Sequence, residues 1–194
     1  MRLPRDLRLA LAPHDTYRLL MAEHVRGTWL RALERPAMLA VTLGIAVTMS
    51  SARRVPLSLV LTGIVCWSFV PIIQWLIGVI VIGRARGRPT SMPRALELLF
   101  AGHLPWSLWI LAMIGLYTFT PITLDLNGQI LSLLAPAVWT TTIVFAFCRT
   151  ALGCSPVHAR LLTAAHQTMT WVVFVVYVVL VSGIGARFLA LVGA

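Results

Sequence analysis

The chain has 194 residues, of which 59% are hydrophobic and only 11% charged, and its mean hydropathy is +0.87. A soluble domain usually has about a quarter of its residues charged, so this composition excludes a water-soluble globular protein and predicts an integral membrane protein. The net charge of +10 comes entirely from arginine. Basic residues of membrane proteins gather at the cytoplasmic surface, so we expect no nucleic-acid binding.

The first 35 residues form an arginine-rich segment that precedes the long apolar runs. Its apolar residues recur at helical spacing, which predicts a helix from Pro13 or Asp15 to Glu34. Two placements remain open for this helix. It lies at the membrane interface with its arginines toward anionic lipid, or it docks in the cytoplasm on the protein's own loops.

Apolar runs without charge divide residues 36–194 into five expected membrane spans. They cover about 36–52, 56–83, 97–120, 129–148 and 160–184. A helix needs about 20 apolar residues to cross the bilayer core, and about 17 is the lower limit. We therefore predict an all-α fold, a polytopic membrane bundle of five transmembrane helices that follows the N-terminal segment 1–35.

Residues within the first two spans predict how these spans pack and bend. Ala40, Gly44 and Thr48 recur every four residues in the first span, and small residues at this spacing favour close contact between helices. Pro71 should kink the second span, because proline removes one backbone hydrogen bond. Gln74 lies close enough along the helix to satisfy the backbone group that is freed.

The distribution of arginine predicts the orientation of the bundle. If the N-terminus is cytoplasmic, 13 arginines lie in cytoplasmic segments and three lie outside, and the opposite orientation reverses these totals. The short cytoplasmic loops of membrane proteins carry the excess of basic residues. We therefore expect the N-terminus inside and the C-terminus outside.

The loop between the second and third spans is the most basic part of the bundle. It contains Arg84, Arg86, Arg88 and Arg94 within eleven residues. We expect these arginines to set the topology, and they are our candidates for contacting lipid phosphates or an acidic partner surface. Arg94 and Glu97 are three positions apart on a helix and should form an ion pair at the interface.

Two stretches carry a family resemblance. The first, GRPTSMPRALELLFAGHLP (residues 87–105), is a glycine-containing loop that leads into an amphipathic entry and a helix broken by proline. The second, AFCRTALGCSPVHARLLTAA (146–165), is a turn that precedes an alanine-rich restart. In both, the chain resembles the Yip1 family of small multi-spanning membrane proteins. The resemblance extends over residues 36–183 and implies a five-span plan with a cytoplasmic N-terminus.

Two histidines are the candidate ligands of a buried group. His103 and His166 lie inside expected spans, where ionisable residues favour a functional hypothesis, and Pro105 should break the third span beside His103. Imidazoles on separate helices can ligate haem or another tetrapyrrole, whereas neutral hydrogen-bonded histidines are the simpler interpretation. The sequence contains no metal-ligand, phosphate-binding or nucleophile motif, so we expect no metal site and no enzymatic activity.

Together these features predict a non-enzymatic protein of the bacterial inner membrane. We expect a scaffold, assembly or accessory subunit of a larger membrane complex, which acts through helix packing and its basic cytoplasmic face. Its expected partners are lipids with anionic headgroups and other integral membrane subunits. Two alternatives remain open. One is a cofactor-binding subunit of an electron-transfer or photosynthetic complex, with haem or another tetrapyrrole on His103 or His166, and the other is a transport component.

Overall fold

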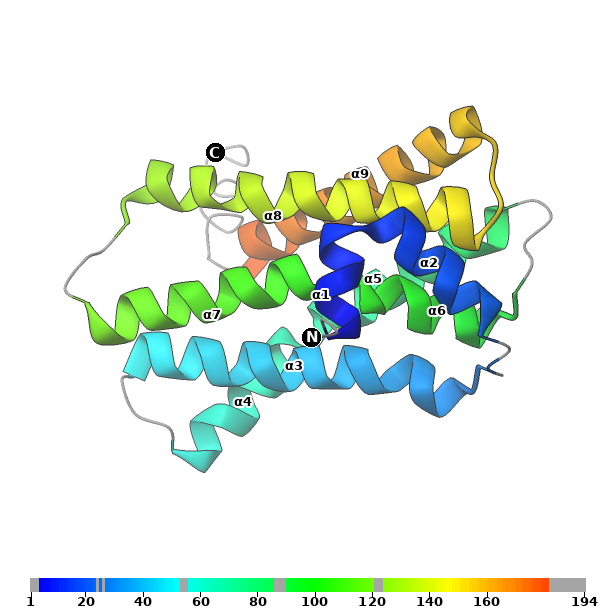
Figure 1. Cartoon of the computed structure of the whole chain (residues 1–194). Helices are drawn as coiled ribbons and strands as arrows, with labels where there is room; N and C mark the ends of the chain where they lie inside the picture. The colour runs from blue at the N-terminus through cyan, green and yellow to red at the C-terminus, as the bar shows by residue number, and fades with distance from the viewer. Residues whose placement is uncertain are drawn as a thin grey trace, which may run out of the picture.

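The computed structural model describes residues 4–23, 25, 27–52, 56–85, 90–120 and 124–181. The regular elements in these segments are all helices (Figure 1), which confirms the expected all-α class for this part of the chain. They are α1 (Arg5–Leu11), α2 (Pro13–Ala22), α3 (Trp29–Ala52), α4 (Leu57–Trp67), α5 (Phe69–Arg84), α6 (Met92–Ala101), α7 (Leu104–Phe119), α8 (Leu126–Ala146), the π-helical turn η1 (Phe147–Ala151) and α9 (Pro156–Val181).

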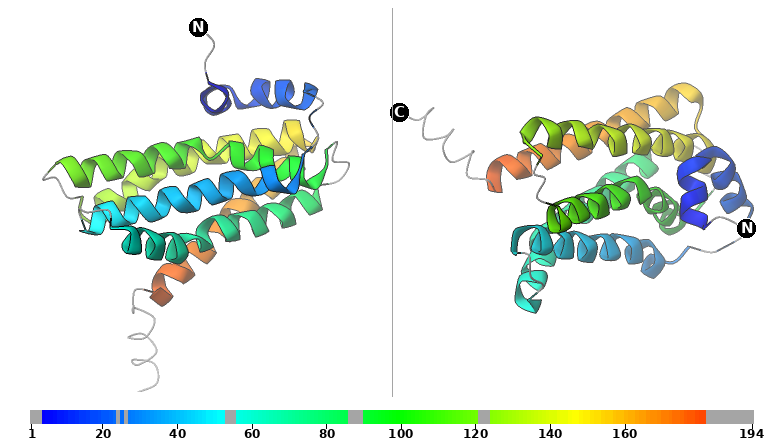
Figure 2. Two further views of the ribbon diagram at one scale, coloured as in Figure 1. Left: turned by 90° about the horizontal axis from the view of Figure 1, so that it is seen from below. Right: turned by 60° about the vertical axis from the view of Figure 1, so that its left-hand side comes forward.

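The long helices lie side by side, and α1 and α2 cross over one half of the bundle (Figures 1 and 2). The last residue of α5 and the start of α9 meet at the same end as α2, where the His158 Nε2 atom lies 3.3 Å from the Arg84 carbonyl oxygen. The end of α3 and the start of α8 lie at the opposite end (Figure 1). We call the first of these the arginine end.

The N-terminal helices dock on the protein itself. Leu9 and Tyr17 are fully buried, and the indole N–H of Trp139 in α8 donates to the Ala10 carbonyl at 2.8 Å. The structure therefore shows this segment packed on the protein's own helices rather than on its loops. Its position relative to the membrane interface stays a prediction. Leu9, Tyr17 and Leu20 of these two helices join the main hydrophobic core.

The expected helix from residue 13 to Glu34 is wrong, because α2 ends at Ala22 and α3 already begins at Trp29. The chain turns between them at Gly27, where a Cβ atom would lie 2.4 Å from the Arg94 backbone nitrogen. A residue without a side chain is needed for this close approach. Arg35 lies within the first long helix, α3, and the expected division of the chain after residue 35 stays a prediction.

Helix α3 packs closely on α4, and small residues allow it. A Cβ atom on Gly44 would lie 2.5 Å from the Ile64 backbone nitrogen, so the two backbones touch at this point. The Thr48 hydroxyl lies 2.8 Å from the Gly44 carbonyl oxygen and 3.2 Å from that of Leu59 in α4. Ala40 is also buried. Small residues let helix backbones approach in this way.

The second expected span consists of α4 and α5, which meet at Ser68. Pro71 has no N–H for the Trp67 carbonyl, and this missing hydrogen bond explains a break one turn before the proline. Gln74 was expected to satisfy the freed backbone. Instead its side-chain oxygen lies 3.1 Å from Nε2 of His103, on a different helical segment.

The third expected span is also broken, at Gly102 and His103, between α6 and α7. The two helices are bent by 40°. Pro105 lies in the first turn of α7, where its missing N–H costs nothing, and so it begins a helix after the break. The fourth expected span, α8, contains Pro136 and continues through it to the π-helical turn.

Several of these helices are compatible with a membrane protein. Among the described residues, three helical stretches are long and apolar enough to cross a bilayer: Trp29–Met49, Leu57–Arg84 and Asn127–Ala151. The bent pair of α6 and α7 passes the same criterion as one unit and makes a fourth. The fifth expected span, at 160–184, corresponds to α9 and extends beyond the described residues. The number of five spans and the orientation of the bundle both stay predictions.

Candidate functional site

A large cavity lies inside the bundle, between α3, α5, α7, α8 and α9. Its volume is about 610 Å³, within the range of small-molecule sites. We call it the bundle cavity. Most of its wall is apolar and aromatic, and its larger side chains include Leu39, Leu43, Trp67, Phe69, Trp106, Trp109, Met113, Tyr117, Trp171 and Phe174.

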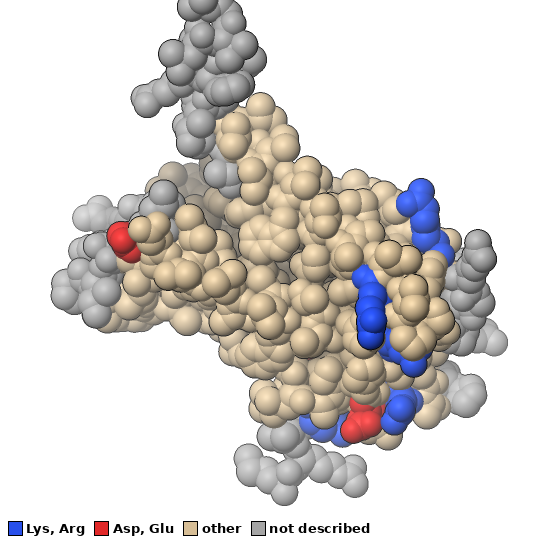
Figure 3. All heavy atoms as spheres, turned by 90° about the horizontal axis from the view of Figure 1, so that it is seen from above, with Lys and Arg blue, Asp and Glu red and all other residues tan. Residues whose placement is uncertain are grey.

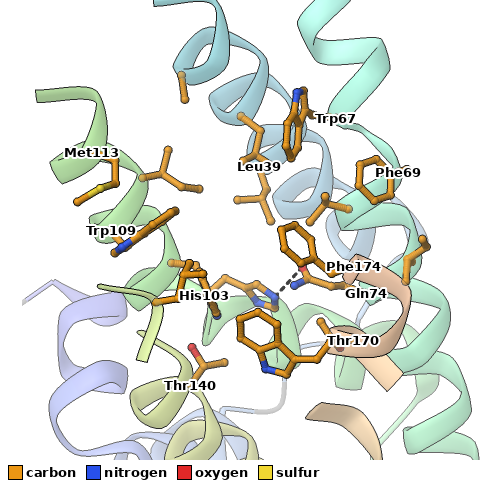
Figure 4. Close-up of a pocket in the computed structure, with 18 of the residues that line it drawn as sticks. Leu39, Trp67, Phe69, Gln74, His103, Trp109, Met113, Thr140, Thr170 and Phe174 are labelled. Carbon is orange, nitrogen blue, oxygen red and sulfur yellow. Dashed lines mark hydrogen bonds between the residues drawn. The ribbon is translucent and has the colours of Figure 1, made fainter. Parts of the chain in front are cut away.

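His103 lines this cavity, and the break between α6 and α7 places it there. Its ring stacks on Phe100, with the ring centroids 4.7 Å apart. Its Nε2 atom lies 3.1 Å from Oε1 of Gln74, and Figure 4 shows the two side chains pointing toward one another. The other ring nitrogen, Nδ1, is buried and makes no hydrogen bond of good geometry within the described residues, although the Leu99 and Phe100 backbone lies near the ring.

His166 reaches the same cavity from α9. Only 3% of its surface is exposed, and neither ring nitrogen has a hydrogen-bond partner in the described part of the chain. The sequence placed His103 and His166 as candidates, and the structure brings them to one cavity although 63 positions separate them. What the sequence did not indicate is Gln74 as the partner of His103.

Further polar side chains surround the two histidines. The hydroxyls of Thr140 and Thr170 and the amide nitrogen of Gln167 are buried without a hydrogen-bond partner among the described residues. Buried polar groups in proteins are nearly always hydrogen-bonded, and each one left unpaired costs about 1–3 kcal/mol. One part of an otherwise apolar cavity therefore carries several unused hydrogen-bonding groups.

A second cavity lies beside the first, near the arginine end. Its volume is about 460 Å³, and we call it the arginine cavity. Charged residues of α1, α3 and α6 line it: Arg5, Asp6, Arg31, Glu34, Arg35 and Glu97. Leu39 and His103 line both cavities, so the two cavities meet at these side chains.

The arginines expected to form a contact surface are placed differently from one another. Arg84 is exposed at the end of α5, whereas Arg86 and Arg88 lie outside the described residues. Arg94 is buried, with 3% of its surface exposed, which corrects its expected place on that surface. Its guanidinium pairs with Glu97 at 2.9 Å and donates to the Leu20 carbonyl at 3.1 Å. The expected Arg94–Glu97 pair is therefore present, but it holds α2 on α6.

Haem fits the bundle cavity poorly. The residues that line it include no arginine, lysine or carboxylate, so the two propionates of a haem would find charged partners only in the adjoining arginine cavity. Nε2 of His103, a ligating atom for iron, is also engaged by Gln74. Within the described residues, no group of three or more His, Cys, Asp or Glu side chains could hold a metal ion. A molecule that offers hydrogen-bonding groups and needs no metal ligands fits better.

Comparison with protein-family models, with curated proteins and with solved structures finds no match to this chain.

Proposed function

We propose that this chain is a non-enzymatic integral membrane protein that binds an amphipathic, lipid-soluble molecule in the bundle cavity. The observation that carries the proposal is the set of unpartnered polar atoms of His103, His166, Thr140 and Thr170 in one part of an aromatic-lined space. A ligand that offers a polar group there and an apolar body elsewhere would match both parts of the wall. Small-molecule sites commonly have this composition.

The energetics favour a bound molecule over an empty cavity. His166 could be replaced by an apolar side chain without the loss of any hydrogen bond within the described residues. A side chain that brings only an unpaired polar group into the bundle destabilises the fold, unless a ligand provides the missing hydrogen bonds. We therefore assign His166 and His103 to ligand binding, with Gln74 orienting the His103 ring.

The test is recovery of the ligand. The protein, purified in mild detergent, is extracted with organic solvent, and the extract is analysed by mass spectrometry. We expect the wild type to yield a stoichiometric amphipathic compound. In His166→Leu the affinity for this compound should fall more than about tenfold, because one hydrogen bond between neutral groups contributes about a factor of ten. His14→Leu is the matched control, since His14 is exposed and contacts Thr150 outside the cavity.

The melting temperature distinguishes a cavity that holds a ligand from an empty one. If the cavity is empty, His166→Leu leaves the melting temperature unchanged or raises it. If the ligand is present, the variant melts lower than the wild type and no longer gains stability from added extract. A wild-type protein that yields no compound, together with an unchanged or raised melting temperature in His166→Leu, would refute the proposal.

A second candidate function is that of a scaffold or accessory subunit, as the Yip1 resemblance suggests. The supporting observation is the segregation of charge: the exposed arginines lie toward one end of the molecule, as Figure 3 shows for one face. Those described include Arg8, Arg18, Arg31, Arg84 and Arg160. This face would contact anionic headgroups and other membrane subunits, with the N-terminus in the cytoplasm of a bacterium.

This second function has its own test. The protein is extracted in mild detergent, run on a native gel, and its co-migrating subunits are identified. A combined Arg84→Gln and Arg160→Gln variant should release the partners, whereas the histidine variants should retain them. Migration of the wild-type protein as a single chain would exclude the subunit role and leave the ligand-binding proposal standing.

A further inference from the structure

The geometry points to a zwitterionic phospholipid as the ligand, with its headgroup in the arginine cavity and its acyl chains in the bundle cavity. This inference rests on the proposed function and names the class of molecule that the site takes. It follows from three observations: the contact between the two cavities, the balance of charge in the smaller one, and the buried polar atoms at their junction.

The two adjoining cavities differ in polarity as the two parts of an amphiphile do. The larger one, about 610 Å³, has an apolar and aromatic wall, whereas the smaller one, about 460 Å³, is lined by charged groups. Leu39 and His103 belong to both linings. His103 is 92% buried and keeps one ring nitrogen unpartnered at this junction. A molecule that passes the junction would place its chains on one side and its charged group on the other.

The charges that line the arginine cavity balance. Three guanidiniums and three carboxylates face it. Arg35 pairs with Asp6 at 2.9 Å, and Glu97 uses one carboxylate oxygen for Arg94. Among the described residues, neither Arg31 nor Glu34 has an ion-pair partner.

Two buried atoms add to these free groups. Oε2 of Glu97 and Nε of Arg5 are both buried without a hydrogen-bond partner in the described part of the chain. The cavity therefore offers unused donors on Arg5 and Arg31 and unused acceptors on Glu34 and Glu97. A matching ligand must both accept hydrogen bonds from the arginines and donate hydrogen bonds to the carboxylates.

A headgroup with a phosphate and a primary ammonium meets this demand. Guanidiniums bind phosphate oxygens through charge-assisted hydrogen bonds, and carboxylates accept from an ammonium. An anionic headgroup such as phosphatidylglycerol would place its charge near Glu34 and Glu97 without an ammonium to neutralise them. A choline headgroup carries a charge but no N–H, so it leaves the Glu97 oxygen unpaired. Phosphatidylethanolamine is the common headgroup with all the required groups.

The test compares lipids that differ only in the headgroup. Dioleoyl phosphatidylethanolamine, phosphatidylcholine and phosphatidylglycerol are added to the delipidated full chain in detergent, and bound lipid is counted by native mass spectrometry. We expect phosphatidylethanolamine to bind at least about tenfold more tightly than the other two, because charge-assisted hydrogen bonds are the stronger kind. Equal or tighter binding of phosphatidylglycerol would overturn the headgroup assignment.

Variants on the exposed rim keep the fold intact. Glu34→Gln should reduce the preference for phosphatidylethanolamine over phosphatidylglycerol about tenfold, and Arg31→Gln should weaken all three lipids, since all contain phosphate. Arg18→Gln and Asp15→Asn are the matched controls, because this exposed pair on α2 lies outside both cavities. Unchanged selectivity in Glu34→Gln would overturn the inference.

The two proposals fail in distinguishable ways. Lipid binding without headgroup preference overturns the zwitterionic assignment and leaves the proposed function standing, whereas the absence of binding by any of the three lipids overturns both. Soluble glycerophosphoethanolamine tests the source of the headgroup. We expect it to compete only at concentrations far above those of the lipid, because it lacks acyl chains for the bundle cavity. Competition at equal concentration would assign the site to a soluble zwitterion and overturn the lipid.

Discussion

The hydroxyl of Tyr17 donates to the Leu98 carbonyl at 3.2 Å, across 81 positions of the sequence. Leu98 lies in the last turn of α6, and the next free N–H, that of Gly102, bonds to the carbonyls of Leu99 and Phe100 instead. Carbonyls in the last turn of a helix need partners from outside it. Tyr17 therefore caps α6 with its side chain and fixes α2 to the element that positions His103.

We expect Tyr17→Phe to lower the free energy of unfolding by about 1–3 kcal/mol, because the buried Leu98 carbonyl loses its donor. The measurement is denaturant or thermal unfolding in detergent. Tyr117→Phe is the control, since no hydrogen bond of the Tyr117 hydroxyl is seen among the described residues. Equal effects of the two substitutions would show that Tyr17 does not act through this hydrogen bond.

The same tyrosine predicts a dependence on pH. Burial raises the pKa of Tyr17 above its usual value, so the neutral phenol is favoured in the folded state. Its contribution to stability is complete below about pH 10, the usual pKa of tyrosine, and is lost as the pH rises above that value and the unfolded chain ionises. The wild type should therefore lose stability more steeply than Tyr17→Phe as the pH rises above about 10, because the tyrosine of the unfolded chain begins to ionise there. Parallel curves would contradict this.

Because α3 and α4 are in close contact, we expect the addition of one methyl group at Gly44 to destabilise the fold. Gly44→Ala would force the new Cβ to within 2.5 Å of the Ile64 backbone, so the helices must separate. Overpacking of this kind costs about 1–3 kcal/mol. Gly83→Ala is the matched control on a helix, because nothing lies within 4 Å of its Cβ position. Thermal unfolding should show a loss for the first variant and no loss for the second.

The buried ion pair predicts a strong effect from removal of one partner. Arg94→Met should destabilise the fold by about 3–5 kcal/mol, because Glu97 is left charged and unpaired, whereas Arg94→Met with Glu97→Leu should recover much of the loss. In comparison, Arg18→Met should change stability by less than about 1 kcal/mol, because the Arg18–Asp15 pair is exposed to solvent. A double variant as unstable as the single one would show that the Leu20 carbonyl contact dominates.

The burial of the cysteines determines which of them a thiol reagent can modify. Cys148 and Cys154 are buried, whereas Cys66 is exposed on α4. Burial also raises the pKa of the Cys154 thiol, although Arg149 acts in the opposite direction, so less of the reactive thiolate forms at pH 8. We expect N-ethylmaleimide to leave Cys148 and Cys154 unmodified in the folded protein in detergent and to modify both after unfolding. Rapid modification of Cys154 in the folded state would disagree with its burial.

Local patterns in the sequence predicted those features of the molecule that depend on neighbouring residues. The apolar composition indicated helices compatible with a membrane, and Pro71 and Pro105 indicated breaks, because proline acts on the turn that contains it. Arg94 and Glu97 could be paired from their spacing alone, since i,i+3 residues lie on one helix face. The extent of burial of that pair was not predictable, because it comes from α2 and Gly27 rather than from α6.

What only the tertiary structure decided are the relationships between distant helices. The sequence marked His103 and His166 as polar residues in apolar surroundings, but not that Gln74 engages one of them, nor that aromatic side chains from several helices enclose both. The expected continuous helix to Glu34 is likewise interrupted by a distant contact: α2 ends at Ala22, α3 begins at Trp29, and Gly27 between them approaches the Arg94 backbone. Periodicity specifies the face that a helix buries, whereas packing decides what that face meets.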